Sequence, residues 1–200
     1  TQTFTMPGEG TRGSQVQSTK VGALDNNLIG VSAGAPDAVW AVGQVGNQGL
    51  VLFWDGTTWA SITSPNPDPR VFLSGVHAIT TDDVWVVGFY GGGGGTLERT
   101  LTLHCSRSGC AAVVSPNSGV GDDGLEAVAA VSASEVYAVG YSTVTTDTYA
   151  RVPLSMRWNG TGWSTLPTPP TPPSVSTFAF HHLSFVSSGD LWAVGYIYNS

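Results

Sequence analysis

Apolar and polar residues alternate in short runs along most of the chain, which is the pattern of half-buried β-strands. The clearest runs contain Val-Trp-Ala-Val followed by Gly, as at residues 39–43. Turn-forming clusters such as DGTT, SRSG and NGTG separate the runs, and their Gly, Asp and Asn residues suit tight turns. No stretch has the 3.6-residue period of an amphipathic helix. The pattern therefore predicts an all-β protein.

The strand pattern is repeated in four segments that align without gaps. They share two apolar positions, an acidic group, an aromatic residue and a Val-Gly pair. The segments are residues 28–43, 73–88, 125–140 and 180–195. A second alternating element follows the first three of them, at residues 50–65, 101–116 and 154–169. Each full unit is thus predicted to contain four short strands around one core aromatic. These aromatics are Trp40, Trp85, Tyr137 and Trp192.

Repeats of four strands and about 40–50 residues are typical of β-propeller blades. The predicted division is an N-terminal strand or hairpin segment at 1–27, three complete blades, and the first half of a fourth. The blades are expected at residues 28–72, 73–124 and 125–179, with the half blade at 180–200. The ring is four-bladed if the N-terminal hairpin closes it. Otherwise the chain is part of a larger ring.

The repeat motifs also resemble a known class of protein. D-x-V-W-A-V-G and W-D-G-T-x-W resemble the repeats of secreted bacterial β-propellers, and they are similar in style to tectonin-type and Kelch-type blades. The resemblance covers about residues 28–198 and implies four-stranded antiparallel blades, with little information on function. The DGTTW stretch also resembles the Asp-box of sialidase-like propellers with altered spacing. That box is a structural hairpin element, so it implies no catalysis.

The stretch HCSRSGC contains both cysteines of the chain. In the aligned repeats, Cys105 and Cys110 occupy the columns that hold Trp54 and Trp59 in the first unit. Each pair brackets a four-residue turn, so its members are expected to face each other across a hairpin, at a separation that a disulfide can bridge. A metal site that includes His104 and a redox pair are the weaker alternatives. A disulfide in turn predicts an oxidising, extracytoplasmic location.

Charge and composition exclude several classes of function. The formal net charge is −7, and the cations are Lys20 and six scattered arginines. A chain without a basic stripe is not expected to bind nucleic acid or anionic lipid. No apolar run approaches the roughly 18 residues that a membrane span needs, so no membrane insertion is expected. The sequence begins at Thr1 without a signal-peptide pattern, which is expected of a processed form or an excerpt.

Strand order predicts that the long, variable connections share one face of the disc, and binding surfaces are often built on such loops. Tolerated variation in loop length is the alternative explanation. The aromatic residues near that face form the possible ligand surface. They are Phe89, Tyr90, Tyr141 and Tyr149. A lectin-like, carbohydrate-binding propeller would use this surface.

Candidate catalytic groups are few. A glycosidase needs two carboxyl groups, and Glu98 and Glu126 are the only glutamates near the loops. A sialidase needs an arginine cluster, for which only Arg70, Arg99 and Arg151 lie near that face. No nucleophile and base are spaced for catalysis. We therefore expect no catalytic residue, no metal and no cofactor, and an enzyme ranks third among the functional hypotheses.

Other polar residues are interpreted as structural. The acidic groups before each core aromatic recur in every unit, so we expect them to bond the amides of their own turns. They are Asp37, Asp82, Asp83, Glu135 and Asp190. His182 replaces a small residue where the blades converge and is expected to bind water rather than a metal, while Asp122-Asp123 is expected to be a solvated loop. Asn159 begins a possible glycosylation sequon on an exposed turn.

The fourth unit stops after two strands, while residues 1–20 contain two strand-like runs outside the repeat. We expect these runs to form a hairpin that completes the last blade, in a neighbouring molecule more than in the same one. The leading hypothesis is a non-enzymatic, extracellular or cell-surface propeller for structure, assembly or adhesion. Its expected partner is itself, as a homo-oligomer or filament, or surface glycans and proteins.

Overall fold

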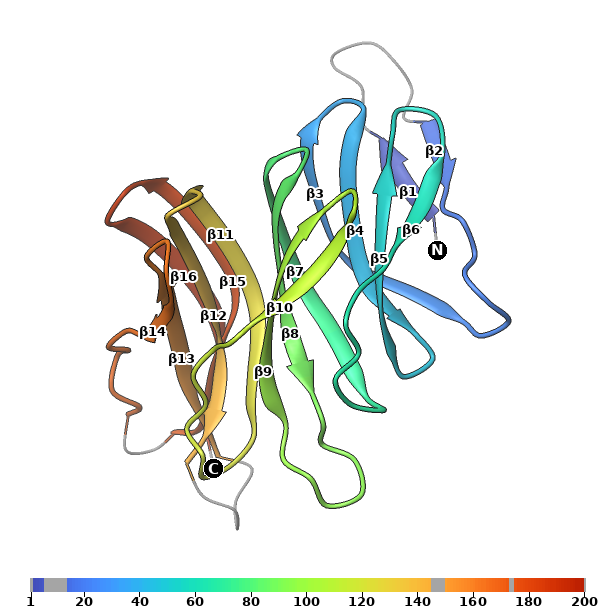
Figure 1. Ribbon diagram of the computed structural model, residues 1–200. Helices are drawn as coiled ribbons and strands as arrows, with labels where there is room; N and C mark the ends of the chain where they lie inside the picture. The colour runs from blue at the N-terminus through green and yellow to red at the C-terminus, as the bar shows by residue number, and fades with distance from the viewer. Residues whose placement is uncertain (1, 6–13, 145–149, 173–174, 200) are drawn as a thin grey trace.

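A computed structural model describes residues 2–5, 14–144, 150–172 and 175–199 of the chain. Every regular element in these ranges is a β-strand, and all strand pairs are antiparallel. Figure 1 shows the strands gathered into separate upright sheets. Within the described ranges, no helix is long and apolar enough to cross a membrane.

Three four-stranded meanders, which we call blades 1, 2 and 3, form the body of the molecule. Blade 1 consists of β3 (Asn26–Ala35), β4 (Ala38–Val45), β5 (Gln48–Trp54) and β6 (Trp59–Ile62). Blade 2 consists of β7 (Val71–Thr80), β8 (Asp83–Tyr90), β9 (Arg99–Ser106) and β10 (Gly109–Val113). Blade 3 consists of β11 (Asp123–Ser132), β12 (Glu135–Thr143), β13 (Arg151–Trp158) and β14 (Trp163–Thr165).

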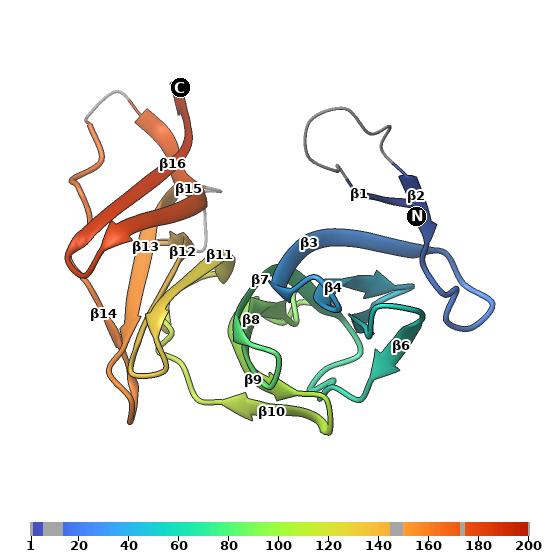
Figure 2. The same cartoon turned by 90° about the horizontal axis from the view of Figure 1, so that it is seen from above.

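Two further sheets have only two strands each. We call the first the half blade, which pairs β15 (Val175–Ser187) with β16 (Asp190–Asn199). The second pairs β1 (Gln2–Thr5) with β2 (Ser14–Gln17). The two lie at opposite ends of the molecule in Figure 2, and the β1–β2 pair lies beside blade 1.

The sheets are arranged as the blades of a propeller around part of a circle. The first strand of each one is innermost, and successive inner strands, β3, β7, β11 and β15, contact one another. Figure 2 looks down on this arc. The predicted fold class, an all-β propeller of antiparallel four-stranded blades followed by a half blade, is therefore confirmed.

The glycine of the repeated Val-Gly pair is required for steric reasons. Strand β3 bulges between Leu28 and Gly30, and the same shift recurs at the matching place in the inner strand of every later unit. Beside the bulge, the carbonyl of Asn27 approaches Gly43 so closely that a Cβ there would collide with it. The glycines with an equivalent backbone collision are Gly88, Gly140 and Gly195. Only glycine fits this column.

The core aromatics seal one blade against the next. Trp40 is completely buried against blade 2, and its Nε1 donates a hydrogen bond to the carbonyl of Thr81, 3.2 Å away. Trp85 is buried in the same way against blade 3, and Tyr137 is 8 % exposed. Trp192, however, is 68 % exposed, so the prediction that it belongs to the core is wrong. The half blade has no following sheet in the described part of the chain to cover this ring.

The outer hairpins confirm the predicted disulfide. Cys105 and Cys110 pair directly across β9 and β10 and are joined by a sulfur–sulfur bond. Trp54 faces Trp59 at the same place in blade 1, with ring centroids 5.6 Å apart. Trp158 and Trp163 repeat the arrangement in blade 3. One cross-strand position is therefore filled by an aromatic pair or by a disulfide.

In blades 1 and 2, the connection that leaves the outer strand caps an amide of its own blade. In blade 1 the Asn66 side-chain oxygen accepts a hydrogen bond from the backbone N–H of Gly49, at 2.9 Å. In blade 2 Asn117 does the same for Thr100. The matching residue in blade 3 is Pro153, which has no N–H to cap. Pro170 stands there where the other connections have asparagine.

The structure does not close a ring within the chain. The β1–β2 pair is a sheet of its own and is not hydrogen-bonded to the half blade. Residues that follow it hold it near blade 1, where the Thr19 hydroxyl donates to the carbonyl of Trp59 at 2.9 Å and Val21 packs on the blade. Residues 1 and 6–13 of the predicted hairpin lie outside the described residues.

Candidate functional site

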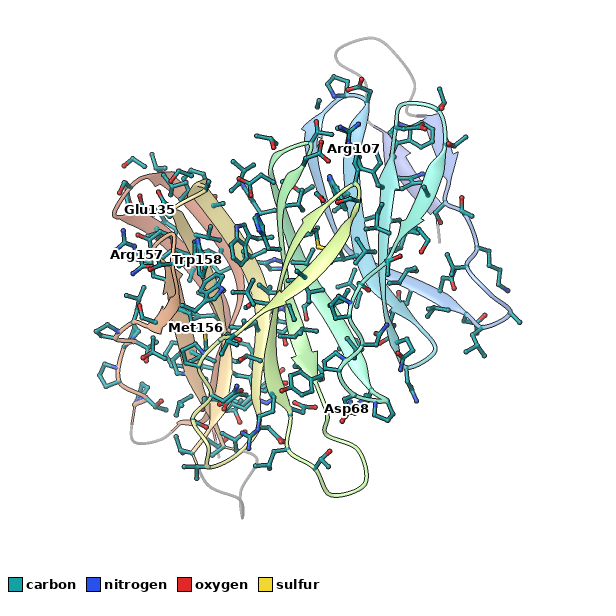
Figure 3. The ribbon with its side chains drawn as sticks, viewed as in Figure 1. Asp68, Arg107, Glu135, Met156, Arg157 and Trp158 are labelled. Carbon is teal, nitrogen blue, oxygen red and sulfur yellow. A yellow bond between two sulfur atoms is a disulfide. The ribbon has the colours of Figure 1, made fainter. Side chains whose placement is uncertain are left out.

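The blades present two different ends. The turns inside each hairpin lie at one end, which we call the turn face, and the longer connections lie at the other, the loop face. Figure 3 shows Arg107 and Glu135 towards the turn face and Asp68 towards the loop face. Candidate chemistry must therefore be located on one of these faces, in the space between the inner strands, or at the open end of the arc.

Acidic groups on the turn face tie elements together. Asp82 accepts hydrogen bonds from the backbone and guanidinium of Arg107 in the neighbouring hairpin, at 2.6–3.0 Å. These bonds lower the pKa of Asp82 to about 2. Asp83 bonds His104 at 2.8 Å, and Glu135 accepts from the hydroxyl of Ser188 in the half blade. The hydrogen bonds of these three acids thus differ from the expected capping of their own turns.

Side chains do cap their own turns in the second hairpin of blade 1 and of blade 3. One side-chain oxygen of Asp55 accepts from the amides of Thr57 and Thr58, at 2.8 and 2.7 Å. These amides, with the Thr57 hydroxyl, lower the pKa of Asp55 to about 2. Asn159 receives the same bonds in blade 3 from Thr161 and Gly162. Asn159 is exposed, and its glycosylation stays a prediction.

The predicted aromatic ligand surface is wrong for two of its members. Phe89 is 8 % exposed, because its ring stacks on Phe72 with centroids 5.2 Å apart. Tyr141 is 2 % exposed. Tyr90 is half-buried, and Tyr149 lies outside the described residues. The first two rings stabilise the blades and do not offer a surface to a sugar.

Tyr141 is instead the centre of a charged network on the loop face. Its hydroxyl donates to Glu98 at 2.6 Å, and the Arg151 guanidinium lies 3.7 Å above its ring. Burial and the carboxylate of Glu98 raise the pKa of Tyr141 well above its usual range. Glu98 also lies 3.5 Å from Arg70, and Arg151 donates to Tyr196 of the half blade. The network links blade 2, blade 3 and the half blade.

The acidic residues Asp122 and Asp123, next to this network, also accept hydrogen bonds from backbone amides. Asp122 accepts a hydrogen bond from the amide of Glu98, at 2.9 Å. Asp123 is completely buried, accepts from the amide of Ser118 at 2.7 Å and lies 3.8 Å from Arg99. The expectation of a solvated loop is wrong for Asp123, because its carboxylate holds the connection against blade 3.

The inner strands line a partly open cavity of about 580 Å³. Its polar lining comes from all four units. The residues are Ser32, Ser74, His77, Glu126, His181 and His182. His181 Nδ1 lies 3.9 Å from Glu126 Oε2, and its ring stacks on His182 with centroids 5.5 Å apart. Burial raises the pKa of Glu126 and lowers the pKa of His77.

This cavity has the groups to hold a polar molecule or ordered water. Within the described ranges, no three metal-ligating side chains gather closely enough to hold an ion. Glu98 and Glu126, the pair considered for glycoside hydrolysis, differ in setting. Glu98 is occupied by Tyr141 and Arg70, whereas Glu126 lies on the cavity wall beside His181.

The open end of the arc exposes several large apolar side chains. Trp192, Val194 and Tyr198 of β16 are each more than 60 % exposed. In the described chain, β16 pairs only with β15, so its other edge has no strand beside it. The sequence predicted this edge from the unit that stops after two strands. It did not predict the groove of about 220 Å³ that lies between the half blade and blade 3.

Comparison with known proteins gives little further information. No known family matches the chain, and no curated protein matches it. Among solved structures, it is similar to one described as "YCF48 bound to D1 peptide". The identity is 15 % and the TM-score 0.48, over 90 % of this chain and 68 % of that one.

Proposed function

We propose that this chain is a non-enzymatic, extracytoplasmic β-propeller module that works in surface structure, assembly or adhesion by accepting β-strands from a partner. The observation that carries the proposal is the half blade. Its strand β16 exposes Trp192 and Val194 and has an unpaired edge in the described chain. Exposed, apolar strand edges recruit further strands.

The contrast with the complete blades supports a docking role. The residues that match Trp192 and Val194 in blade 1 are Trp40 and Val42, and both are completely buried by blade 2. Large exposed apolar surfaces on a folded chain commonly mark interaction sites. In the assembly that we propose, the partner covers the half blade as blade 2 covers blade 1, and repetition of that contact generates oligomers or filaments.

The proposed location rests on the disulfide. A bond between Cys105 and Cys110 persists in oxidising compartments and is rare where thiols are kept reduced. We therefore place the protein outside the cytoplasm, at the cell surface or secreted. The division of the chain into blades at residues 28, 73, 125 and 180 is part of the same proposal.

Carbohydrate binding is the second candidate, and the exposed rings of Trp192 and Tyr198 favour it, since sugars stack on such rings. We propose no hydrolysis, because Glu98 is occupied by its own partners. Sugar turnover that is lost when Glu98 or Glu126 alone is changed to Gln would contradict this part of the proposal. Binding to a glycan array that is lost in Tyr198→Ala would favour a lectin.

Sedimentation velocity over a wide concentration range tests the assembly role. We expect concentration-dependent oligomers of the unmodified protein and monomers of the Trp192→Lys variant. Val114→Lys is the matched control, because Val114 is 91 % exposed and lies in the connection after β10, outside the half blade. A protein that stays monomeric throughout, or a variant that assembles normally, would show that the half blade does not mediate self-assembly.

A further inference from the structure

At one position of the inner strands the repeat keeps its backbone shape and changes its side chain. In each unit, the bulge beside the glycine of the Val-Gly pair leaves one residue of the inner strand without a register partner. These residues all line the central cavity, and they are Ile29, Ser74, Glu126 and His181. Bulges redirect side chains and are common beside functional sites. We propose that these four residues, which we call the bulge site, bind the primary ammonium group of an alkylamine.

The columns beside the bulge are nearly constant, which sets this position apart. Directly before the bulge every unit has a large apolar residue, and two residues after it every unit has a valine or leucine. At the bulge itself the four units have an isoleucine, a serine, a glutamate and a histidine. Packing alone does not require such variety, whereas a ligand contacted from several sides needs a different group on each side.

The charge of the cavity suits a cation. Among the described residues that line it, Glu126 is the only acid, and there is no lysine or arginine. Burial raises the pKa of Glu126, because the cavity solvates an ionised carboxylate less well than water does. Arg151 and Glu98 also act on it, with opposite signs, but both are held by Tyr141 outside this lining. A cationic ligand beside Glu126 would replace the solvation that its carboxylate loses.

The polar groups of the bulge site can accept the hydrogen bonds of an ammonium group. His181 Nδ1 lies 3.9 Å from Glu126 Oε2, which is too far for a hydrogen bond between them. One nitrogen atom could lie within hydrogen-bond distance of both. The Ser74 hydroxyl is buried and has no partner among the described residues, although buried hydroxyl groups normally have one. A primary ammonium has three N–H donors and no acceptor, which matches this set of groups.

The rest of the lining suits an alkyl chain. Ile29 and Val31 are 47 % and 62 % exposed, and Val76 and Val128 line the same cavity. Its volume of about 580 Å³ lies in the range of roughly 300–1,000 Å³ found for sites of small organic molecules. The described lining contains no Trp, Tyr or Phe, so it lacks the aromatic cage that binds quaternary ammonium groups. No residue of β16 contributes to it, so this inference is independent of the proposed assembly role.

Three small molecules test the chemistry of the site. Pentylammonium has both the charge and the N–H donors, pentyltrimethylammonium has the charge without the donors, and pentan-1-ol has a donor without the charge. Each is titrated into the 200-residue protein and followed by two-dimensional amide NMR. The titration is done at about pH 8, where ordinary carboxyl groups are ionised and ordinary imidazoles are neutral. Pentylammonium should shift the amides of the bulge site saturably, and the other two should bind at least about tenfold more weakly.

Charge variants locate the binding. Glu126→Gln keeps the shape of the side chain and removes its charge, and should weaken pentylammonium binding by about tenfold or more. Ile29→Lys places an ammonium of the protein's own in the site and should have an effect at least as large, and the partial exposure of Ile29 protects the fold. Asp37→Asn is the matched control. It removes the same charge from an exposed residue in the turn between β3 and β4, outside the cavity, and should bind normally.

Ser74→Ala separates binding from folding. The hydroxyl that it removes has no partner among the described residues, so the temperature of thermal unfolding should not fall. The affinity for pentylammonium should fall by about two- to tenfold, as expected for one lost hydrogen bond. Unchanged affinity in this variant would contradict the place of Ser74 in the site.

A free amine and a lysine side chain present the same group, so a peptide identifies the source. The peptide acetyl-Gly-Lys-Gly-amide is compared with the same peptide containing norleucine in place of lysine. Saturable binding of the lysine peptide supports the site with a polypeptide as the source, and binding of pentylammonium alone supports it with a small amine. Three results would overturn the inference: no saturable shift with either ligand, equal binding of pentyltrimethylammonium, or an equal loss of affinity in Asp37→Asn and Glu126→Gln.

Discussion

Blade 1 and the half blade contain nearly the same inner hairpin, but they differ in what surrounds it. Both have the bulge beside a motif glycine, and both carry the motif Trp-Ala-Val-Gly, with Trp40 in one and Trp192 in the other. Trp40 is fully buried and Trp192 is 68 % exposed. The hairpin therefore adopts the same shape without a sheet on its far side, whereas burial of its aromatic ring depends on the next blade.

The largest expected effect tests that dependence. Trp40→Ala leaves a cavity between blades 1 and 2 and should lower the free energy of unfolding by about 3–5 kcal/mol. Trp192→Ala removes a ring that touches little in the isolated chain, and should change it by no more than about 0.5 kcal/mol. Guanidinium denaturation of both variants provides the measurement. Similar losses in the two variants would show that the half blade is covered in solution, most directly by a partner.

The motif glycine should behave alike in a complete blade, here blade 2, and in the half blade. Gly88→Ala and Gly195→Ala each bring a Cβ against a backbone carbonyl of the adjacent strand. We expect Gly88→Ala to cost at least the roughly 1–3 kcal/mol of an overpacked core. Gly195→Ala should disturb the half blade alone, which hydrogen exchange of its amides would detect. Gly93→Ala, with no atom within 4 Å of the added Cβ, is the control and should unfold like the parent protein.

The asparagine caps sharpen the comparison among the complete blades. Asn117→Ala removes the acceptor for the Thr100 amide and should cost about 1 kcal/mol, the net contribution of one hydrogen bond. Asn66→Ala should have a similar effect through Gly49. Pro170→Ala in blade 3 removes no cap and should leave thermal stability within experimental error. A loss in Pro170→Ala as large as that in Asn117→Ala would contradict this account.

The smallest expected effect lies where blade 3 meets the half blade. Burial raises the pKa of Glu126, so the folded protein binds a proton more tightly there than the unfolded chain does. The contribution of Glu126 to stability is therefore fully present below its unfolded pKa and is lost as the pH rises through its folded pKa. Glu126→Gln should flatten the stability profile over this window. A profile that is unchanged in chemical denaturation at several pH values would show that His181 and Arg151 compensate fully.

Much of the fold could be predicted from the sequence, because the repeat makes each blade evidence for the others. The Trp54, Cys105 and Trp158 column predicted both the hairpin register and the disulfide, since directly opposed residues share one spatial position. The burial of Trp40 and Trp85 followed from the same repetition. The exposure of Trp192 did not, because an alignment records what residues share and not which neighbour each one has.

The candidate site was harder to predict, since it depends on contacts between units. Tyr141 was expected at the surface because it follows the motif glycine at the loop face, but Glu98 and Arg151 enclose it from two different connections. The turn acids were expected to cap their own turns. Asp82 instead reaches Arg107, 25 residues away, a partner that no local pattern indicates. Long-range pairs of this kind have no periodicity, so the sequence alone does not reveal them.

Asn66 occurs together with the amide donor of Gly49, whereas Pro170 occurs together with Pro153, which has no amide to donate. This correspondence has a consequence for redesign. An outer hairpin and the connection that follows it form one exchangeable cassette, because an amide near the start of the hairpin's first strand determines whether the connection needs an acceptor. A chimaera that receives a connection from blade 3 and a strand from blade 1 would leave a donor without its partner. Exchange of the two together carries the donor and its acceptor as a unit, so whole hairpins with their exits are the parts from which such propellers can be recombined.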